Sequence, residues 1–443
     1  MGTQGFDIDR PISSPLDREA IANIEVGQTN VTPRVARASV AWFLLLLIVL
    51  PLTELVAPDA GNPWRHLAAL PDAISERLAQ SIGESAWNRL VDANRAVLEA
   101  LSAFETALED RSRVGRTLRP DTQRVLSSWL GAGNERVYVG EGGWLFYRPD
   151  VEYVTGRGFL DEIQIERRRL AATEYEEPPA PDPRPAIRQF HRDLAARGIT
   201  LVLMPTPVKP SIHPGQLAAS FDAQTGPLQN SSYYALLREL RHQGVLVFDP
   251  SADLTHLRAA GEQPYLVTDT HWRPEAMQKV AESLAAFVQQ HVTLARVPAP
   301  GYQAQRREAQ QMGDTAAMLD LPPDQTLYPP ERVSLRFIVD AAGDPWRPSR
   351  EADILLLGDS FTNMYSLQTM GWGEAAGLAE QVSYVLQRPL DRIVQNDNGA
   401  HATRAQLARE VGGSARLAGK RVVIWQFAAR ELAFGDWRVM HQP

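Results

Sequence analysis

A serine that directly follows an apolar run is the first candidate for chemistry in this sequence. The run Asp353–Leu357 (DILLL) predicts a strand buried on both faces, and Gly358, Asp359 and Ser360 come next. Ligands bind outside the carboxyl ends of strands in open α/β sheets, and a glycine there permits the sharp turn that exposes a hydroxyl. We therefore expect Ser360 to act as a nucleophile. An N-capping serine after a turn glycine is the alternative interpretation.

A serine nucleophile needs a base, and one of the nine histidines stands out. His271 lies in the segment Tyr265–Trp272 (YLVTDTHW), where an apolar stretch ends just before a predicted helix. Residues two apart in an extended segment point to the same side, so Asp269 is expected to orient His271 while the other ring nitrogen faces Ser360. A helix cap formed by Asp269 or Thr270 is the alternative. A metal site would need a further clustered ligand, and we expect neither a metal nor a cofactor.

The composition is that of a globular protein: 443 residues, 44% hydrophobic and 22% charged, with a net charge of -8. The absence of cysteine excludes disulfides, thiolate metal sites and cysteine nucleophiles. Without a long basic stripe, nucleic acid is not an expected partner.

The N-terminal region predicts a membrane anchor. Residues 1–37 are polar and without periodicity, which predicts a disordered cytoplasmic tail, and Ala38–Thr53 is an uncharged run of sixteen residues. Extended over 38–57, this run approaches the length of a spanning helix. Arg34 and Arg37 precede it, which places the rest of the chain outside the cytoplasm. A cleaved signal peptide is the competing interpretation.

The rest of the chain predicts a helical region followed by an α/β domain. Residues 58–134 form the membrane-proximal region, with helical spacing over 72–112, and 135–443 form the second domain. A β-hairpin is expected over 136–147, and residues 171–185 predict an acidic, Pro-rich loop. Apolar strands alternating with helices then imply a parallel sheet with helices on both sides. The predicted strands cover 200–204, 245–248, 333–339, 353–357, 392–394 and 421–427, and the helices cover 186–197, 233–242, 274–290, 372–387 and 402–411.

The order of these motifs resembles that of a known family. Thr268–Trp272 (TDTHW) followed by Gly358–Phe361 (GDSF) resembles the alginate O-acetyltransferase family of SGNH-hydrolase-like proteins, which includes AlgJ and AlgX. The segments Val139–Phe146, Pro205–Pro214 and Val423–Leu432 fit the same family. Its acid and base precede the serine, in an order permuted relative to ordinary SGNH hydrolases. The predicted anchor makes this chain more similar to membrane-anchored AlgJ.

The resemblance implies a periplasmic enzyme, held at the inner membrane by a single span, that acetylates hydroxyls of an exopolysaccharide. Its partners would be the polysaccharide acceptor and a membrane-bound O-acyltransferase that supplies the acyl group. By the motif match, Ser360 would be the nucleophile, His271 the base and Asp269 the orienting acid.

Several residues are weaker candidates for contacts at the site. Sugar or donor could contact Trp272, Trp372, Trp425, Lys209 and Arg430, with core aromatics and surface charges as the alternatives. Asn396 or Asn398 could serve an oxyanion, although Asn398-Gly399 is also a plain turn signal.

Two other functions stay open at this point. A glycan acetyl esterase would use the same triad. A non-catalytic glycan-binding scaffold would leave Ser360, His271 and Asp269 far apart.

Overall fold

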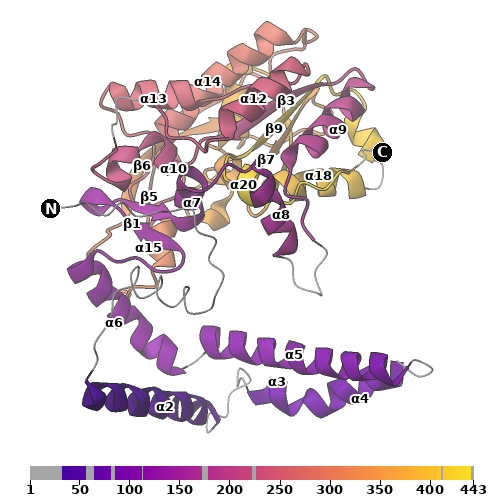
Figure 1. Ribbon diagram of the computed structural model, residues 1–443. Coiled ribbons are helices and arrows are strands. Elements are labelled where there is room, and N and C mark those ends of the chain that lie inside the picture. Colours follow the sequence, from indigo (N-terminus) through magenta and orange to yellow (C-terminus); the bar gives the residue numbers. More distant parts are fainter. Residues whose placement is uncertain are drawn as a thin grey trace, which may run out of the picture. The chain divides into compact units, whose positions relative to one another are not determined.

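The computed structural model describes residues 32–55, 64–80, 85–111, 113–171, 178–221, 226–410 and 413–440 (Figure 1). The chain divides into two compact units at Arg119 and Pro120, rather than at the boundary of 134 expected from the sequence. Residues 1–31 of the predicted tail lie outside the described residues. The last part of that tail is helical, because the first helix begins at Pro33.

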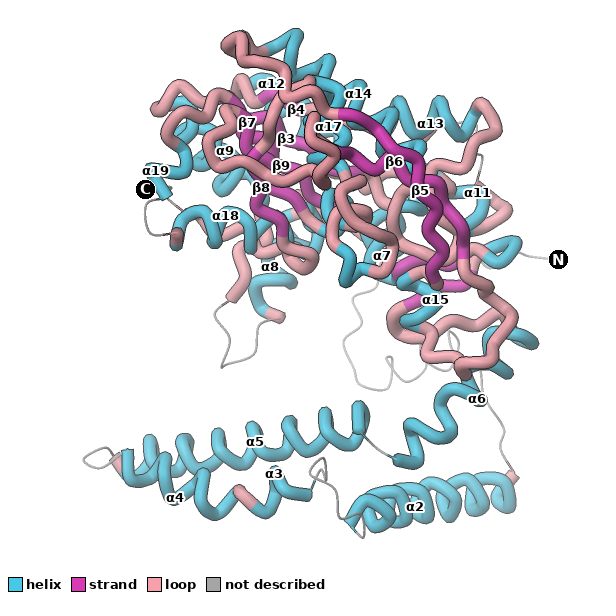
Figure 2. Tube along the Cα trace, turned by 180° about the vertical axis from the view of Figure 1, so that it is seen from behind, coloured by secondary structure: helices cyan, strands magenta, loops and turns pink. Residues whose placement is uncertain are grey.

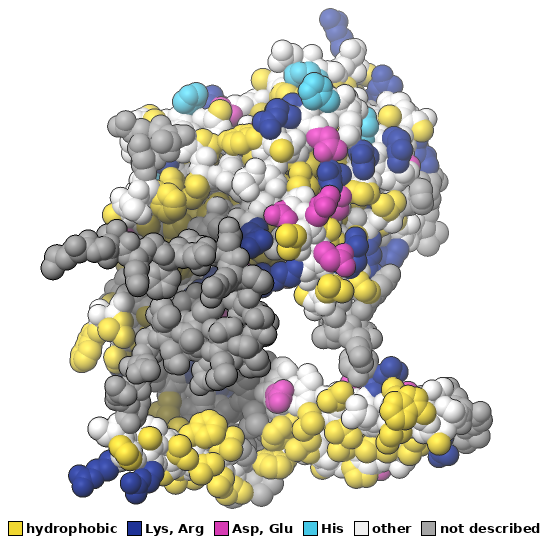
Figure 3. Space-filling view, in the orientation of Figure 1, with side chains coloured by type: hydrophobic (Ala, Val, Ile, Leu, Met, Phe, Trp, Pro, Cys, Tyr) yellow, Lys and Arg dark blue, Asp and Glu magenta, His cyan; other side chains and the backbone are white. Residues whose placement is uncertain are grey.

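The first unit is helical. It contains α2 (Pro33–Leu55), α3 (Trp64–Ala68), α4 (Leu70–Gln80), α5 (Ala86–Arg111) and the start of α6 (Arg113–Leu130). Helix α5 packs against α3 and α4, with the rings of Trp64 and Phe104 5.1 Å apart. Figure 3 shows apolar side chains gathered over this unit. Across the described ranges, the helices lack the combined length and apolar character that a membrane crossing requires. The anchor predicted over 38–57 is therefore not shown, and its residues 56 and 57 lie outside the described part.

The second unit is built on a five-stranded sheet in the order β4-β3-β9-β7-β8, in which every pair is parallel. This confirms the predicted parallel sheet. The strands are β3 (Thr200–Thr206), β4 (Leu246–Val247), β7 (Ile354–Gly358), β8 (Asp391–Val394) and β9 (Val422–Ala428). All residues of β7 and β9 are buried, because these two strands are interior to the sheet and covered on both faces.

Alternate residues of the strands build two cores, one on each face of the sheet. Leu355 and Leu357 of β7 face the core that includes α9 (Pro183–Ala195), α12 (Tyr233–His242) and α18 (Gly399–Arg409). Ile354 and Leu356 face the opposite core, which includes α14 (Pro274–His291) and α17 (Leu378–Leu386). Helices thus cover both faces, as the sequence predicted (Figure 1).

One predicted strand lies outside this sheet. The segment 333–339 belongs to β6 (Glu331–Val339), which pairs antiparallel with β5 (Gln303–Gln311) in a separate two-stranded ribbon (Figure 2). Its assignment to the parallel sheet was wrong. The partner strand β5 (QAQRREAQQ) is polar and almost wholly exposed, so its sequence has no apolar alternation from which the ribbon could be predicted. The helix predicted over 372–387 likewise begins only at Leu378.

The remaining elements are short. The predicted hairpin is confirmed as β1 (Val137–Val139) and β2 (Leu145–Tyr147), joined through η1 (Glu141–Gly143). In the predicted loop 171–185, residues 172–177 lie outside the described residues, and Asp182 caps α9. The other elements are α7 (Arg148–Thr155), α8 (Glu162–Leu170), α10 (Lys209–Ile212), α11 (Pro214–Leu217), α13 (Ser251–Ala259), α15 (Asp314–Met318), α16 (Ser360–Asn363), η3 (Gln368–Met370), α19 (Gly413–Leu417) and α20 (Glu431–Phe434).

Candidate active site

Ser360 stands at the carboxyl end of β7, at the first position of α16. The preceding turn requires glycine, because a Cβ at Gly358 would lie 2.7 Å from Cβ of Thr362. The serine is 7% exposed, so its hydroxyl lies at the mouth of the strand rather than on an open surface.

A buried polar network fixes the turn beneath Ser360. The carboxylate of Asp359 accepts hydrogen bonds from the backbone N–H of Phe361 at 2.9 Å, from Nε2 of Gln426 at 2.8 Å and from the backbone N–H of Ala428 at 2.5 Å. Oε1 of Gln426 in turn accepts from the backbone N–H of Asp359 at 3.0 Å. Asp359 therefore caps α16 and ties the serine turn to β9, which gives it a structural role.

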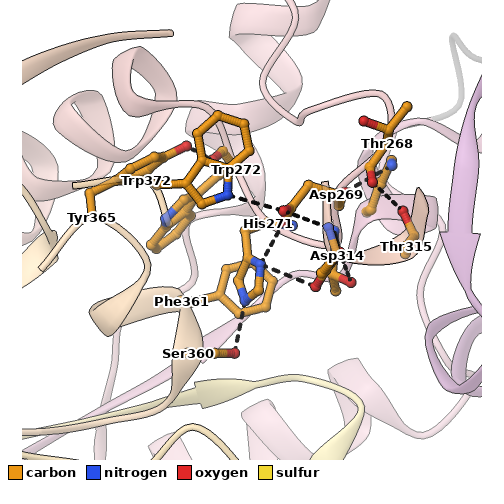
Figure 4. Close-up of polar contacts among 12 residues, drawn as sticks. Thr268, Asp269, His271, Trp272, Asp314, Thr315, Ser360, Phe361, Tyr365 and Trp372 are labelled. Carbon is orange, nitrogen blue, oxygen red and sulfur yellow. Dashed lines mark hydrogen bonds and ion pairs between the residues drawn. The ribbon is translucent and has the colours of Figure 1, made fainter. Parts of the chain in front are cut away.

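His271 joins Ser360 to Asp269 (Figure 4). Its Nε2 lies 2.8 Å from Oγ of Ser360, and its Nδ1 lies 2.7 Å from Oδ1 of Asp269. The imidazole and the carboxylate are 5% and 2% exposed. Because an ionised carboxylate only accepts, Nδ1 carries the proton toward Asp269, and Nε2 is free to accept the serine proton. The structure thus brings the three predicted residues into hydrogen-bond contact, which the scaffold hypothesis did not expect.

A second acid, Asp314 at the start of α15, lies beside this pair and was missed in the sequence. Its Oδ1 accepts from the backbone N–H of Thr270 at 2.7 Å and from the Thr270 hydroxyl at 3.0 Å. Its own backbone N–H donates to Oδ2 of Asp269 at 3.0 Å. The only local signal is Gly313, where a Cβ would lie 2.7 Å from the backbone nitrogen of Asp269. No spacing rule connects that glycine to the histidine.

The charges of the site shift its pKa values in opposite directions. Burial opposes ionisation of Asp269, but the hydrogen bond and charge of His271 outweigh it and lower the pKa of Asp269. Burial likewise opposes protonation of His271, and the two carboxylates outweigh it, so that the pKa of His271 is raised. Burial and the neighbouring Asp269 raise the pKa of Asp314 to about 6. The site therefore holds one firmly ionised acid, one strengthened base and one acid that titrates near neutrality.

The site lies within a stretch of the chain that matches a known protein family. The sequence profile of the SGNH hydrolase-like domain of the acetyltransferase AlgX matches residues 137–429. The chain belongs to this AlgX family.

Known relatives agree with this assignment. The probable alginate O-acetylase AlgJ of Pseudomonas aeruginosa is 28% identical over 232 residues, which cover 52% of this chain and 53% of that protein. The probable alginate O-acetylase AlgJ of Pseudomonas putida is 25% identical over 309 residues, 68% of this chain and 71% of that protein. The match thus spans about half the length of the Pseudomonas aeruginosa relative. The solved O-acetyltransferase domain of Pseudomonas putida AlgJ shares the fold, with a TM-score of 0.51 at 19% identity over 68% of this chain and 93% of that one.

Lys209 does not lie where a substrate of this AlgX-family chain could contact it. The side chain is fully buried, and Nζ donates to the backbone carbonyls of Leu145, of Val267 at 2.7 Å and of Asp269 at 2.9 Å. Burial lowers the pKa of this ammonium to about 8. Its prediction as a substrate contact was wrong, because the charge is used to hold the backbone under Asp269.

The three tryptophans are also core residues rather than sugar-stacking faces. Trp272 and Trp425 are fully buried, and Trp372 is 2% exposed. Trp272 packs against Phe361, while Nε1 of Trp372 donates to Oδ2 of Asp269 at 3.3 Å. Trp425 belongs to the core on the other face of the sheet, where it packs against Phe190 and Trp437. The predicted stacking role was therefore wrong for all three tryptophans.

The remaining candidates lie around the serine turn. Arg430, 18% exposed at its side chain, pairs with Asp150 at 3.0 Å. Asn363 lies one helical turn after Ser360, and its Nδ2 donates to Oδ1 of Asn396 at 2.9 Å. Asn398 precedes α18 with φ of 52°, which confirms the turn interpretation. The backbone N–H of Ser360 has no hydrogen-bond acceptor within the described part of the chain, so it can donate to a bound oxygen.

One group in the site has the spacing of metal ligands. Ligand atoms of Asp269, His271 and Asp314 all lie within 4.8 Å of one another. Nδ1 of His271 is the nitrogen that faces both carboxylates, and it carries the proton in the tautomer that leaves Nε2 free to accept from Ser360, so it offers no lone pair to a metal. The donor set therefore fits proton transfer from a hydroxyl better than metal coordination.

Proposed function

We propose that this AlgX-family protein is an exopolysaccharide O-acetyltransferase that moves an acetyl group to a sugar hydroxyl through an acyl-enzyme on Ser360. The observation that carries the proposal is the buried line of hydrogen bonds from Asp269 through His271 to Ser360. The names of the two AlgJ relatives support both the acetyl group and the polysaccharide acceptor.

The first half-reaction loads the serine. Nε2 of His271 takes the proton of Ser360 while Oγ attacks the carbonyl carbon of the acyl donor. The oxygen of that carbonyl becomes an oxyanion, and the backbone N–H of Ser360, which has no acceptor within the described residues, is the donor that stabilises it in this mechanism. Collapse of the tetrahedral intermediate breaks the bond to the leaving group, which departs with the proton held by His271.

The second half-reaction unloads the serine. His271 takes the proton of a sugar hydroxyl, whose oxygen attacks the acyl carbon and forms the new ester. Oγ of Ser360 leaves and recovers the proton from Nε2. The ionised Asp269 stabilises the imidazolium in both halves, since it accepts from Nδ1 throughout.

Turnover of a chromogenic acetyl ester, with and without glycan oligomers, tests this function. Wild type should form a mono-acetylated protein by intact mass. It should release acetate when no oligomer is present, and acetylate the oligomers when they are added. Ser360→Ala should do none of these, whereas the exposed control Ser128→Ala should match wild type. Equal activity of Ser360→Ala would refute the proposal. Release of acetate alone, whatever glycan is offered, would indicate the esterase that the same groups can perform.

We further propose that the protein works in the periplasm, held at the inner membrane near a membrane-bound O-acyltransferase that supplies the acyl group. The support is the uncharged run Ala38–Thr53, preceded by Arg34 and Arg37. Large apolar side chains of α2 are exposed, including Trp42 and Phe43 at 63% each. Carbonate extraction of membranes and protease digestion of spheroplasts test this location. Recovery of the full-length protein from the cytoplasmic fraction would contradict it.

A further inference from the structure

Two carboxylates, rather than one, face the protonated nitrogen of His271. Oδ1 of Asp269 lies 2.7 Å from Nδ1, and Oδ2 of Asp314 lies 3.6 Å from the same nitrogen (Figure 4). The mechanism proposed above uses only the first acid. We infer that Asp314 is a positioning residue for the proposed acyl transfer, which holds the histidine turn and supplies a second negative charge to the imidazolium. This inference rests on the proposed function.

The positioning part follows from the contacts of Asp314. Its carboxylate accepts from both donors of Thr270, the residue between the acid and the base, and its backbone N–H donates to the carboxylate of Asp269. One residue from α15 thus fixes the turn at two points, and limits rotation of Asp269 away from His271. Gly313 permits this approach, because any larger residue would meet the backbone of Thr268 and Asp269.

The electrostatic part follows from distance and partial exposure. Asp314 is 30% exposed at its side chain, so its charge is screened in part by solvent. At an effective dielectric constant of about 40 to 80, a charge at about 4 Å changes the pKa of its neighbour by about one unit. The sign is fixed by the charge: an ionised Asp314 favours the imidazolium and raises the pKa of His271.

Other charged groups act on the same pair and must be kept constant in a test. Asp269 favours the imidazolium, and Arg430 opposes it. Burial and Asp269 raise the pKa of Asp314 to about 6, whereas the pKa of His271 is raised above its usual 6.5, so Asp314 is largely ionised where the histidine titrates. The groups that interact electrostatically with His271 or Asp314 are Asp150, Lys209, Asp269 and Arg430. Glu331 also lies close by, where its carboxylate accepts from the Thr268 hydroxyl.

Asp314→Asn separates the charge from the contacts. The asparagine keeps the backbone N–H to Asp269 and an oxygen for Thr270, while it removes the negative charge. The acid limb of the kcat/KM profile for a chromogenic acetyl ester should therefore move down by about one pH unit. The plateau should stay within about tenfold of wild type. Asp314→Ala removes the Thr270 acceptor as well and should lower kcat further. Asp324→Asn, an exposed acid, is the matched charge control and should leave the profile unchanged.

A direct titration of His271 keeps the inference testable even without turnover. Nitrogen-15 NMR of histidine-labelled protein, with the His271 signal assigned by its loss in His271→Gln, should give a lower pKa in Asp314→Asn than in wild type. Superimposable titrations and pH profiles of folded wild type and Asp314→Asn would overturn the inference. Failure of wild type to acetylate or hydrolyse anything would refute the proposed function, while the titration would still decide the role of Asp314.

Discussion

Replacing Asp269 by asparagine should abolish activity through the tautomer of His271, and the surroundings of the carboxylate show why. Four N–H groups point at Asp269: the backbone and Nδ1 of His271, the backbone of Asp314, and Nε1 of Trp372. No hydroxyl or carbonyl competes with them in the described contacts. In Asp269→Asn, the amide nitrogen Nδ2 must therefore take the place of one carboxylate oxygen and point its own N–H groups at two of these donors.

The two orientations of the amide differ in cost. With Nδ2 toward Asp314 and Trp372, two donors lose their acceptor, at roughly 1–3 kcal/mol each. With Nδ2 toward His271, only the backbone N–H of His271 loses its acceptor, because the imidazole can become the acceptor at Nδ1. The second orientation is favoured by about one hydrogen bond, or roughly tenfold in population. It places the ring proton on Nε2, where it can no longer accept the proton of Ser360.

The tautomer ratio alone lowers kcat about tenfold, and loss of the negative charge that stabilises the imidazolium lowers it further, to a total fall on the order of 10⁴-fold. The free energy of unfolding should fall by about 1–3 kcal/mol. Ester turnover, urea unfolding and the nitrogen-15 shifts of His271 measure these quantities separately. The Asp314→Asn variant is the matched comparison, since it also replaces an acid beside Nδ1 but leaves the tautomer unchanged. An Asp269→Asn enzyme that keeps a tenth of wild-type activity would refute the reasoning.

Other perturbations test the supports of the site. Lys209→Met removes three hydrogen bonds to buried carbonyls, although the carbonyl of Val267 still accepts from the backbone N–H of Leu145. It should lower the free energy of unfolding by about 2 kcal/mol or more, whereas the exposed Lys279→Met should not change it. Asp359→Asn points an amide N–H at the donors that now bind the carboxylate. It should lower the free energy of unfolding, measured in urea, by about 2 kcal/mol and should also lower the activity. Burial and Asp359 raise the pKa of Glu431 from 4.5 to about 7. The contribution of Glu431 to the free energy of unfolding should therefore be greatest below pH 4.5, and be lost as the pH rises through 7, by up to about 3 kcal/mol. Glu431→Gln should flatten that fall, and parallel curves for variant and wild type would contradict the assignment.

Local patterns were enough to single out the three residues that the structure brings into hydrogen-bond contact, Ser360, His271 and Asp269. The apolar run of β7 predicts where a strand ends, and the glycine after it predicts a turn, so Ser360 follows from its neighbours alone. Asp269 and His271 are two residues apart, and that spacing was sufficient to expect a contact. Only the meeting of the two segments across 89 residues required the fold itself.

Contacts between distant segments explain what was missed. Asp314 contacts Asp269 from 45 residues away, and a Gly-Asp pair before a short helix is too common to single out. Lys209 was predicted as a substrate contact, with a surface charge as the alternative, because a lone lysine is nearly always solvated. Its three acceptors are backbone carbonyls, which every sequence has and which no residue type reveals.

The base and the nucleophile are held by separate frameworks. Glu331 of β6 accepts from the backbone N–H of Thr268 at 2.8 Å and from its hydroxyl at 2.7 Å, so that the ribbon absent from the sequence prediction supports the histidine turn. Gln426 of β9 supports the serine turn from inside the parallel sheet.

Between these frameworks, the hydrogen bond between Nε2 of His271 and Oγ of Ser360 is the contact on which the proposed mechanism depends. Because the acid and base lie on one turn that precedes the serine strand, their geometry does not depend on the hydroxyl. Truncation of Ser360 should therefore leave His271 preorganised beside Asp269, with chemistry lost and the base intact. The permuted order thus has a physical consequence: the base is assembled in one part of the fold and presented to a nucleophile that is assembled in another.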